Sequence, residues 1–195
     1  MPARSSCRFS PIRDGLPVDV DGVYIGGGYP ELHAAALSEN DVAKSAIRTL
    51  AAEGAPVYGE CGGLMYLAER MKVGGDVFPM CGVLPFGTRI PAGLALSYVE
   101  IHTRGGLFGS GRTVRGHMYH HSMIDGETPG DRCYDVRTPH GEASEEGYHH
   151  GNVLASYAHL HFASDPGIAS AFVTACEAFR TGRAIVPAGP SSPAD

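Results

Sequence analysis

The chain has 195 residues, of which 43% are hydrophobic and 18% charged, enough for one globular domain of ordinary size and short for two. Its 15 Lys and Arg residues are outnumbered by 21 Asp and Glu residues, giving a net charge of -6, which argues against nucleic acid as a partner. No segment approaches the roughly 20 apolar residues of a membrane-spanning helix, so no membrane association is expected.

Cysteine usage and the N-terminal segment indicate the compartment. The five cysteines are scattered and form no C-x-x-C pair, which argues against a disulfide framework and against a zinc ribbon. The first ten residues lack the hydrophobic run of a signal peptide. We therefore expect a cytoplasmic protein.

Composition predicts one domain with two tails. Residues 8–183 contain no linker and no internal repeat, and we expect them to form the domain. Residues 1–7 belong to a polar, proline-containing stretch, and residues 184–195 carry three prolines. Both segments have the composition of disordered tails.

The first predicted unit is a strand, a glycine turn and a helix. Residues 20–25 form a short apolar run that ends at three consecutive glycines, 26–28. Proline and glutamate then follow at positions that suit the first turn of a helix over residues 30–37.

A second helix and a second strand follow. Apolar residues recur at helical spacing over residues 41–53, Asn40 is in place to cap this helix, and Gly54 is in place to end it. Residues 55–58 begin the next strand. That strand runs through residues 59–63 (GECGG) into an apolar stretch predicted to continue as a helix without a loop.

The remaining elements complete an alternating pattern. Residues 74–122 are rich in glycine and in β-type segments, and their topology is not readable. Residues 153–162 form a nearly continuous apolar run, as expected for one strand covered on both faces. Ser164 or Asp165 caps a last helix, which Gly182 ends. Strands that alternate with helices predict an α/β fold with a doubly wound, mostly parallel sheet.

The most specific local pattern is Gly-x-Cys-x-Gly at a strand-to-helix junction, with Cys61 at its centre. Flanking glycines permit the strained turn of a nucleophile elbow, which raises the middle side chain above the edge of the sheet. The start of the helix at Gly62 would stabilise a thiolate, and backbone N–H groups there can hold an oxyanion. The pattern thus predicts a nucleophile that attacks a carbonyl. The alternative is a small buried cysteine in a tight turn.

A thiol nucleophile needs a base from elsewhere in the chain. His159 and His161 lie two residues apart in the last predicted strand, so they should point to the same side near its C-terminal end. One of them is the candidate base, and the alternative is that both are structural. Ten histidines, most after residue 100, also allow a metal-binding protein, but no H-E-x-x-H or matched Cys/His spacing organises them, so no metal site is assigned.

Three segments carry a resemblance to a known family: residues 25–34 (IGGGYPELHA), 57–67 (VYGECGGLMYL) and 155–164 (ASYAHLHFAS). In this order they resemble the glutamine amidotransferase domain of cobyrinic acid or hydrogenobyrinic acid a,c-diamide synthase. The resemblance implies a class I, or triad-type, amidotransferase with a flavodoxin-like fold. Such a domain takes ammonia from glutamine and passes it to a synthetase domain, which uses ATP and magnesium to amidate the a and c carboxylates of the corrin ring.

The resemblance also implies roles for individual residues. Cys61 becomes the nucleophile, and Gly27, Gly28 and Gly62 would form the oxyanion hole. Those glycines have a rival interpretation as a phosphate loop, although neither G-x-G-x-x-G nor a Walker lysine is present. Related corrin amidases carry Tyr-x-His-Gly-x-Phe where this chain has residues 157–162, which favours His159 as the base.

Two catalytic details depart from the family pattern. Triad enzymes place a glutamate two residues after the histidine, where this chain has His161; a Cys–His dyad is therefore expected, and the reverse assignment of His159 and His161 stays open. In the segment 116–122, Met118 replaces a family carboxylate, while His120 is retained and is assigned to glutamine binding.

A third departure concerns the extent of the chain. Relatives have a synthetase domain, then a further strand and helix of the amidotransferase domain, before the Phe-Ser-Pro segment at residues 9–11. The fold is therefore expected to lack its first strand and helix, and the ATP-binding domain has no visible counterpart. No cofactor is expected in this domain, and ATP and magnesium belong to the missing one.

Three hypotheses follow from the sequence. The first is a glutaminase module of cobalamin biosynthesis whose partners are glutamine and a synthetase domain or chain that holds the corrinoid; a homo-oligomer is compatible with it. The second is a catalytically idle fragment or binding remnant of such a synthase. The third is the metal-binding protein considered above.

Overall fold

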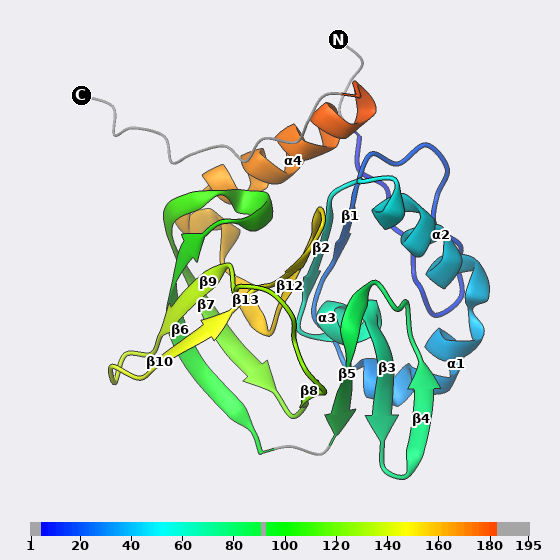
Figure 1. Ribbon diagram of the computed structural model, residues 1–195, viewed down its shortest axis with the longest axis horizontal. Helices are drawn as coiled ribbons and strands as arrows, with labels where there is room; N and C mark the ends of the chain where they lie inside the picture. The colour runs from blue at the N-terminus through cyan, green and yellow to red at the C-terminus, as the bar shows by residue number, and fades with distance from the viewer. Residues whose placement is uncertain (1–4, 91–92, 183–195) are drawn as a thin grey trace.

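A computed structural model describes residues 5–90 and 93–182 (Figure 1). The predicted tail 184–195 and the first four residues of the predicted tail 1–7 lie outside the described residues. The strands form three sheets, which we call the parallel, the mixed and the antiparallel sheet.

The parallel sheet has the strand order β1-β2-β12-β11. Its strands are β1 (Val23–Ile25), β2 (Val57–Glu60), β12 (Val153–Ser156) and β11 (Tyr148–His150). β1, β2 and β12 run parallel, whereas β11 is antiparallel to β12. This parallel core is the part of the molecule in which strands and helices alternate along the chain, as the sequence predicts.

Helices cover both faces of the parallel sheet because successive strand side chains point to opposite faces. Val57 of β2 packs in one apolar cluster with Ile47, while its neighbour Tyr58 packs in a second cluster with Ile168. Ile47 lies on α2 (Asp41–Ala52) and Ile168 on α4 (Gly167–Arg180), so these two helices lie on opposite faces, as Figure 1 shows. The predicted α/β architecture is confirmed.

The predicted helix boundaries hold closely in the first half of the chain. The helix expected over 30–37 begins as a 3-10 turn, η1 (Pro30–His33), and continues as α1 (Ala34–Glu39). Asn40 caps α2 as predicted: its Oδ1 accepts the backbone N–H of Ala43 at 3.2 Å. Gly54, with φ +90°, follows the end of the helix.

Residues 74–122, whose topology the sequence does not reveal, contribute β4, β5, β6 and β7 to the other two sheets. The mixed sheet has the order β4-β3-β5-β8, with β4 (Asp76–Pro79), β3 (Ala68–Val73), β5 (Leu84–Ile90) and β8 (Met123–Asp125). The antiparallel sheet has the order β10-β9-β6-β7-β13, with β10 (Ala143–Glu146), β9 (Tyr134–Arg137), β6 (Ala95–Arg104), β7 (Ser110–His120) and β13 (Ala158–Leu160). A 3-10 turn, η2 (Gly106–Phe108), connects β6 and β7.

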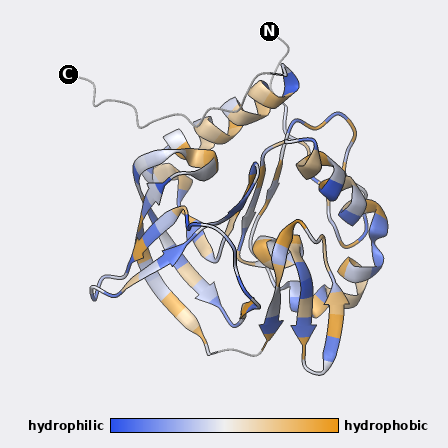
Figure 2. Cartoon of the chain, viewed as in Figure 1, coloured by the Kyte–Doolittle hydropathy of each residue, from blue (hydrophilic) through white to orange (hydrophobic). Residues whose placement is uncertain are grey.

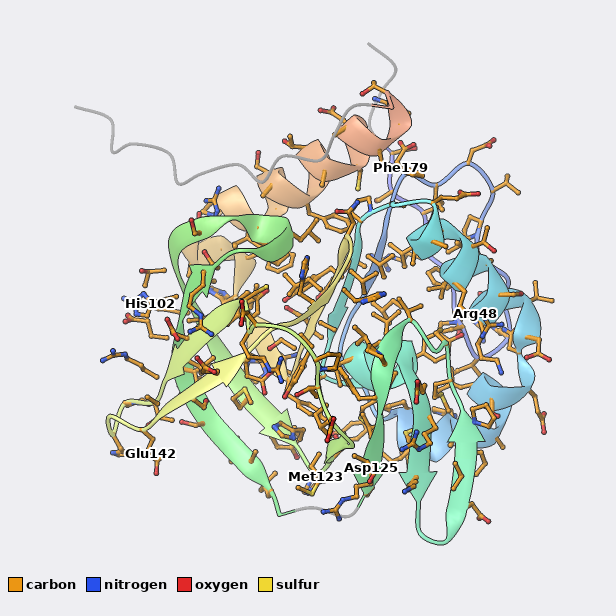
Figure 3. All side chains as sticks on the ribbon, in the orientation of Figure 1. Arg48, His102, Met123, Asp125, Glu142 and Phe179 are labelled. Carbon is orange, nitrogen blue, oxygen red and sulfur yellow. The ribbon has the colours of Figure 1, made fainter. Side chains whose placement is uncertain are left out.

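Asp125, on the edge strand β8 of the mixed sheet, forms ion pairs with two residues of β3. Figure 3 shows this residue on β8, beside β5. Its carboxylate lies 2.8 Å from Lys72 Nζ and 3.4 Å from Arg70 Nη2, both on β3. The pKa of Asp125 is lowered mainly by its hydrogen bond with Lys72.

One prediction is wrong in an informative way: residues 153–162 do not form a single strand. β12 belongs to the parallel sheet, and β13 belongs to the antiparallel sheet. The buried carboxylate of Glu146 accepts the N–H of Tyr157 at 3.1 Å and the hydroxyl of Ser156 at 3.0 Å. Because these bonds satisfy the backbone at the break, the chain can leave one sheet and enter the next at Tyr157.

The helix that follows the cysteine lies where the sheets meet. α3 (Gly62–Leu67) is buried along its whole length, and Figure 2 shows hydrophobic colour at its position. The helix that the sequence predicts after Cys61 is present, and it ends at Leu67 because the chain passes directly into β3 at Ala68. Its first residue follows Cys61, so the fold places the predicted nucleophile at the centre of the molecule.

Candidate active site

Cys61 occupies a strained turn between β2 and α3. Its φ is 49° and its ψ is -101°, and Asp19 is the only other residue besides glycines with positive φ in the described part of the chain. The backbone is held by two hydrogen bonds: Cys61 N–H donates to Ser156 O at 2.8 Å, and Cys61 O accepts from Met65 N at 3.1 Å. Strain of this kind costs on the order of 1–3 kcal/mol and is typical of functional turns.

Two glycines allow α3 to lie directly against the strands. A Cβ on Gly63 would overlap the carbonyl oxygen of Ile25 in β1. A Cβ on Gly59 would lie 2.7 Å from Leu67 Cδ1. The glycines of the Gly-x-Cys-x-Gly pattern are thus required by close packing on both sides of Cys61.

Cys61 opens into a cavity of about 170 Å³. The cavity is lined by residues from five separate segments, among them Gly28, Glu31, Cys61, His117, His120 and His159. These segments are the glycine turn with η1, the turn before α3 with α3 itself, the end of β5, the end of β7 with the turn that follows it, and β13. Residues far apart in the sequence therefore converge on the sulfur atom.

Burial keeps the Cys61 thiol protonated, contrary to the predicted thiolate. The residue is 6% exposed, and burial raises the pKa of its thiol to about 11, with smaller contributions from the charges of Glu31 and Glu60. Backbone N–H groups of Gly62 and Gly28 oppose this by hydrogen bonding to the sulfur. The thiol itself donates to Tyr119 O at 3.5 Å. Attack on a substrate therefore requires a base that removes the proton.

The two N–H groups beside the sulfur come from neighbouring turns. A Cβ on Gly62 would lie only 3.0 Å from Gly28 N, so these two glycines are in contact across the cavity wall. Both are residues that the sequence analysis assigned to an oxyanion hole. Their position is suitable for binding an oxyanion formed next to the sulfur.

His159 lies in the same cavity on β13. Its imidazole is partly buried and stacks on that of His117, with ring centroids 4.5 Å apart and planes 6° from parallel. A Cβ on Gly27 would overlap His159 Cε1, so the glycine turn makes room for the ring. Burial lowers the pKa of His159, and the nearby His117 and His120 lower it further. The imidazole is therefore neutral at pH 7 and able to accept a proton.

The structure separates His161 from His159. β13 ends at Leu160, and His161 begins the turn into η3 (Phe162–Ser164), so the strand alternation that would align the two histidines is broken. His161 is exposed, and it is absent from the cavity lining within the described residues. Of the two candidate bases, only His159 shares the cavity with Cys61.

His120 lines the cavity and carries a buried acceptor that has no partner among the described residues. Its Nδ1 donates to Ser122 O at 2.7 Å, so the proton is on Nδ1 and Nε2 is an acceptor. Nε2 is buried and has no hydrogen-bond partner in the described part of the protein. The ring stacks on Tyr157, with centroids 4.0 Å apart. Burial lowers the pKa of His120 and so favours the neutral form.

Met118 does not occupy the site. Its partly buried side chain packs against the apolar clusters on both sides of the sheet junction, and it is absent from the lining of the cavity described above. The carboxylate that the family pattern places here would thus not be aimed into this cavity. The substitution therefore leaves the described cavity lining unchanged.

Glu60 is a site residue that the sequence analysis missed. It precedes Cys61 and is 3% exposed. Its carboxylate accepts hydrogen bonds from Tyr24 OH at 2.7 Å, Tyr58 OH at 2.8 Å and Leu160 N at 2.9 Å. Burial raises the pKa of Glu60, and the three hydrogen bonds counteract this. Because Leu160 follows His159, this carboxylate links the strand of the nucleophile to the strand of the histidine.

We expect Glu60→Ala to lower the free energy of unfolding by roughly 2–4 kcal/mol, because it leaves buried donors without an acceptor. Urea denaturation followed by circular dichroism measures this. The control is Glu145→Ala, which removes an exposed carboxylate 2.8 Å from Arg104 Nη1 and should cost less than about 1 kcal/mol. Equal effects of the two substitutions would show that the carboxylate of Glu60 is not a structural link.

The described residues give no support to the metal-binding hypothesis. Within 5–90 and 93–182, no three His, Cys, Asp or Glu side chains are placed to hold a metal ion together.

Among the described helices, none combines the length and the apolar composition needed to cross a lipid bilayer.

Solved structures show the class of fold. A crystal structure described as a glutamine amidotransferase aligns with a TM-score of 0.52 and 19% identity, covering 80% of this chain and 79% of that chain. The structure of PurLQS from Thermotoga maritima aligns with a TM-score of 0.58 and 13% identity, covering 83% and 82% of the two chains. At these identities the likeness concerns the fold alone. The fold is that of a glutamine amidotransferase, as predicted.

Sequence comparison gives the family. Residues 2–167 match the CobB/CobQ-like glutamine amidotransferase domain, and the chain belongs to this family. The cobyrinate a,c-diamide synthase of Leptospira interrogans is 43% identical over 86% of this chain and 38% of its own length. The hydrogenobyrinate a,c-diamide synthase of Streptomyces coelicolor is 37% identical over 86% of this chain and 34% of its own length. The chain thus spans less than two fifths of the length of these relatives.

Proposed function

We propose that this chain releases ammonia from the side-chain amide of glutamine, with Cys61 as the nucleophile and His159 as the base. The observation that carries the proposal is that a buried thiol on a strained turn and a neutral imidazole line one cavity, while the N–H groups of Gly28 and Gly62 are bonded to the sulfur. These are the parts that acyl transfer to a thiol requires.

The first half of the reaction forms a thioester. His159 takes the thiol proton as the sulfur attacks the amide carbon, and the carbonyl oxygen becomes an oxyanion bound by the N–H groups of Gly28 and Gly62. The imidazolium then returns the proton to the amide nitrogen, the C–N bond breaks, and ammonia leaves. Water attacks the thioester with His159 again as the base, and glutamate and the free thiol are released.

His120 provides a binding contact for glutamine in this scheme. Its buried Nε2 accepts one N–H of the substrate and so satisfies the atom that has no partner in the free protein. A group that needs an N–H donor discriminates against ligands without one. Glutamate, the product, lacks the amide N–H₂ and would bind less tightly if that group is the donor.

The use of the ammonia is proposed from the relatives. Their names indicate a,c-diamidation of cobyrinate or hydrogenobyrinate, a step of cobalamin biosynthesis. We propose that this chain supplies ammonia to a synthetase part that holds the corrinoid and uses ATP and magnesium, and that the amidotransferase domain itself needs no cofactor. The five cysteines, all free, fit a reducing cytoplasm.

The proposal is tested by measuring glutamate formation from L-glutamine by the purified protein, with L-asparagine as the control substrate. Steady release of glutamate, and none of aspartate, is the expected result. An absence of turnover, both alone and with a corrinoid synthetase added, would instead support a catalytically idle binding module.

The acid limb of the pH dependence of this activity is set by the protonation of His159. His159 accepts a proton only when neutral, and its pKa is lowered from 6.5. The acid limb of kcat/KM should therefore be centred below pH 6.5, with the value falling as the pH drops through the lowered pKa. An acid limb centred above pH 6.5 would contradict this assignment of the base.

A further inference from the structure

His159 lacks the carboxylate that orients the histidine in a triad, because the residue two positions later is the exposed His161. The structure supplies a different neighbour. β7 pairs with β13 so that His117 lies directly opposite His159, and their rings stack 4.5 Å apart, 6° from parallel. Gly27 closes another side of the His159 ring, since a Cβ there would overlap Cε1.

The backbone contacts around this pair fix its spacing. Gly116, the residue before His117, has no Cβ, and one placed there would overlap His159 O. The N–H of Leu160 is bound at 2.9 Å by the Glu60 carboxylate. The first contact brings β7 and β13 close together beside the stacked rings, and the second ties β13 to β2, so the pairing of β7 with β13 cannot shift without losing these contacts.

Building on the function proposed above, we propose that His117 is a positioning residue for the base: its ring, stacked on His159, fixes the plane of the imidazole that removes the thiol proton. In a triad, a hydrogen-bonded carboxylate holds the histidine and stabilises its charged form. A stacked imidazole holds the ring but disfavours a second positive charge beside it. The arrangement thus favours a neutral base at rest.

Several other titratable groups face the pair. Tyr98 of β6 lies opposite His117 in the register, and the Glu60 carboxylate interacts electrostatically with His117. On the cavity side, His120, Cys61 and Glu31 lie near His159. A substitution at His117 leaves all of these groups in place, so a change in kcat or in the His159 titration reports on the His117 ring itself.

The test compares His117→Phe, which keeps a flat ring without a charge, with His117→Ala, which removes the ring. His117 is exposed, so neither change opens a core cavity. His102→Ala is the control, because His102 is a half-buried histidine on β6 of the same sheet and does not line the cavity (Figure 3). Turnover of L-glutamine is measured against pH, and the titration of the His159 Cε1 proton is followed by NMR, which needs no activity.

We expect His117→Ala to lower kcat by about tenfold or more with little change in KM, because a loose imidazole spends less time in the reacting orientation. His117→Phe should keep most of the plateau kcat. In both variants the acid limb of kcat/KM and the NMR midpoint of His159 should move to higher pH by roughly 0.5. His102→Ala should change none of these quantities.

The outcomes separate this inference from the proposed function. Unchanged kcat and unchanged His159 titration in both variants would overturn the role of His117 while leaving the glutaminase proposal intact. An equal loss of kcat in the two variants, together with a raised KM, would also overturn the positioning role, because it would indicate that His117 contacts the substrate. A shifted His159 titration in a protein without glutamine turnover would support the stacked pair and reject the function.

Discussion

Replacing Cys61 with alanine should abolish glutamine hydrolysis, lowering kcat by about 1,000-fold or more, while the protein stays folded. In the proposed reaction the sulfur forms the thioester, and removal of a covalent nucleophile has effects of this size or larger. The fold should persist because alanine fits the space of the thiol and keeps the backbone hydrogen bonds to Ser156 and Met65. Glutamate release and circular dichroism of the same sample measure both effects.

Cys81→Ala is the matched control. Cys81 is also buried, and burial raises its pKa to about 12, but it packs in the apolar cluster away from the cavity. We expect it to keep wild-type turnover per folded molecule. Turnover that survives in Cys61→Ala, or that is lost equally in both variants, would contradict the role of Cys61.

The second large effect is expected from Gly63→Ala, which should destabilise the protein by roughly 3 kcal/mol or more. The new Cβ would overlap the carbonyl oxygen of Ile25, which belongs to the backbone of β1 and cannot rotate away. α3 would have to shift away from the parallel sheet, and Cys61 would shift with it. Thermal and urea denaturation report the loss of stability.

Gly75→Ala provides the comparison. Gly75 lies in the turn between β3 and β4, where an added Cβ would meet nothing within 4 Å. Its substitution should change the free energy of unfolding by less than about 1 kcal/mol. If Gly63→Ala were equally mild, the close contact between α3 and β1 would not be what holds the turn at Cys61.

Sequence reasoning succeeded where the relevant chemistry lies within a few consecutive residues. The cap at Asn40 and the turn at Cys61 depend on local backbone geometry, which the residue types and glycines report directly. Cys61 follows β2, and His159 lies three residues beyond the end of β12, the parallel neighbour of β2, so the prediction that both residues lie near the carboxyl ends of adjacent strands is compatible with their shared cavity. Their catalytic roles stay predictions.

Sequence-based predictions fail where the conformation or protonation of a residue is determined by residues distant in the chain. The break between β12 and β13 depends on the carboxylate of Glu146, ten residues before Ser156 and invisible in the apolar pattern of the segment. That break also removes His161 from the side of His159. The prediction of a thiolate at Cys61 considered the adjacent helix terminus, which is visible in the sequence, whereas the pKa of the thiol is set mainly by burial, which depends on how the folded chain packs around it.

The neighbours of His159 show the same limit. His117 contacts the predicted base His159, but only the pairing of β7 with β13 reveals this contact. Glu60 precedes the predicted nucleophile Cys61, but only its hydrogen bond with Leu160 N reveals that it also holds β13. A carboxylate inside an otherwise apolar strand was the available signal for Glu60, because a buried charge needs hydrogen-bond partners. The stacking of His117 on His159 depends on the register between β7 and β13, which could not be predicted from the sequence.

The most direct test of the account is peptide mass spectrometry after treatment with an electrophilic glutamine analogue that alkylates thiols. We predict a single adduct on Cys61, protection by excess L-glutamine, and no adduct on Cys81, which is fully buried and lies outside the cavity lining. Labelling confined to the exposed Cys7, or labelling of Cys61 that glutamine does not suppress, would contradict the claim that Cys61 is a glutamine-directed nucleophile.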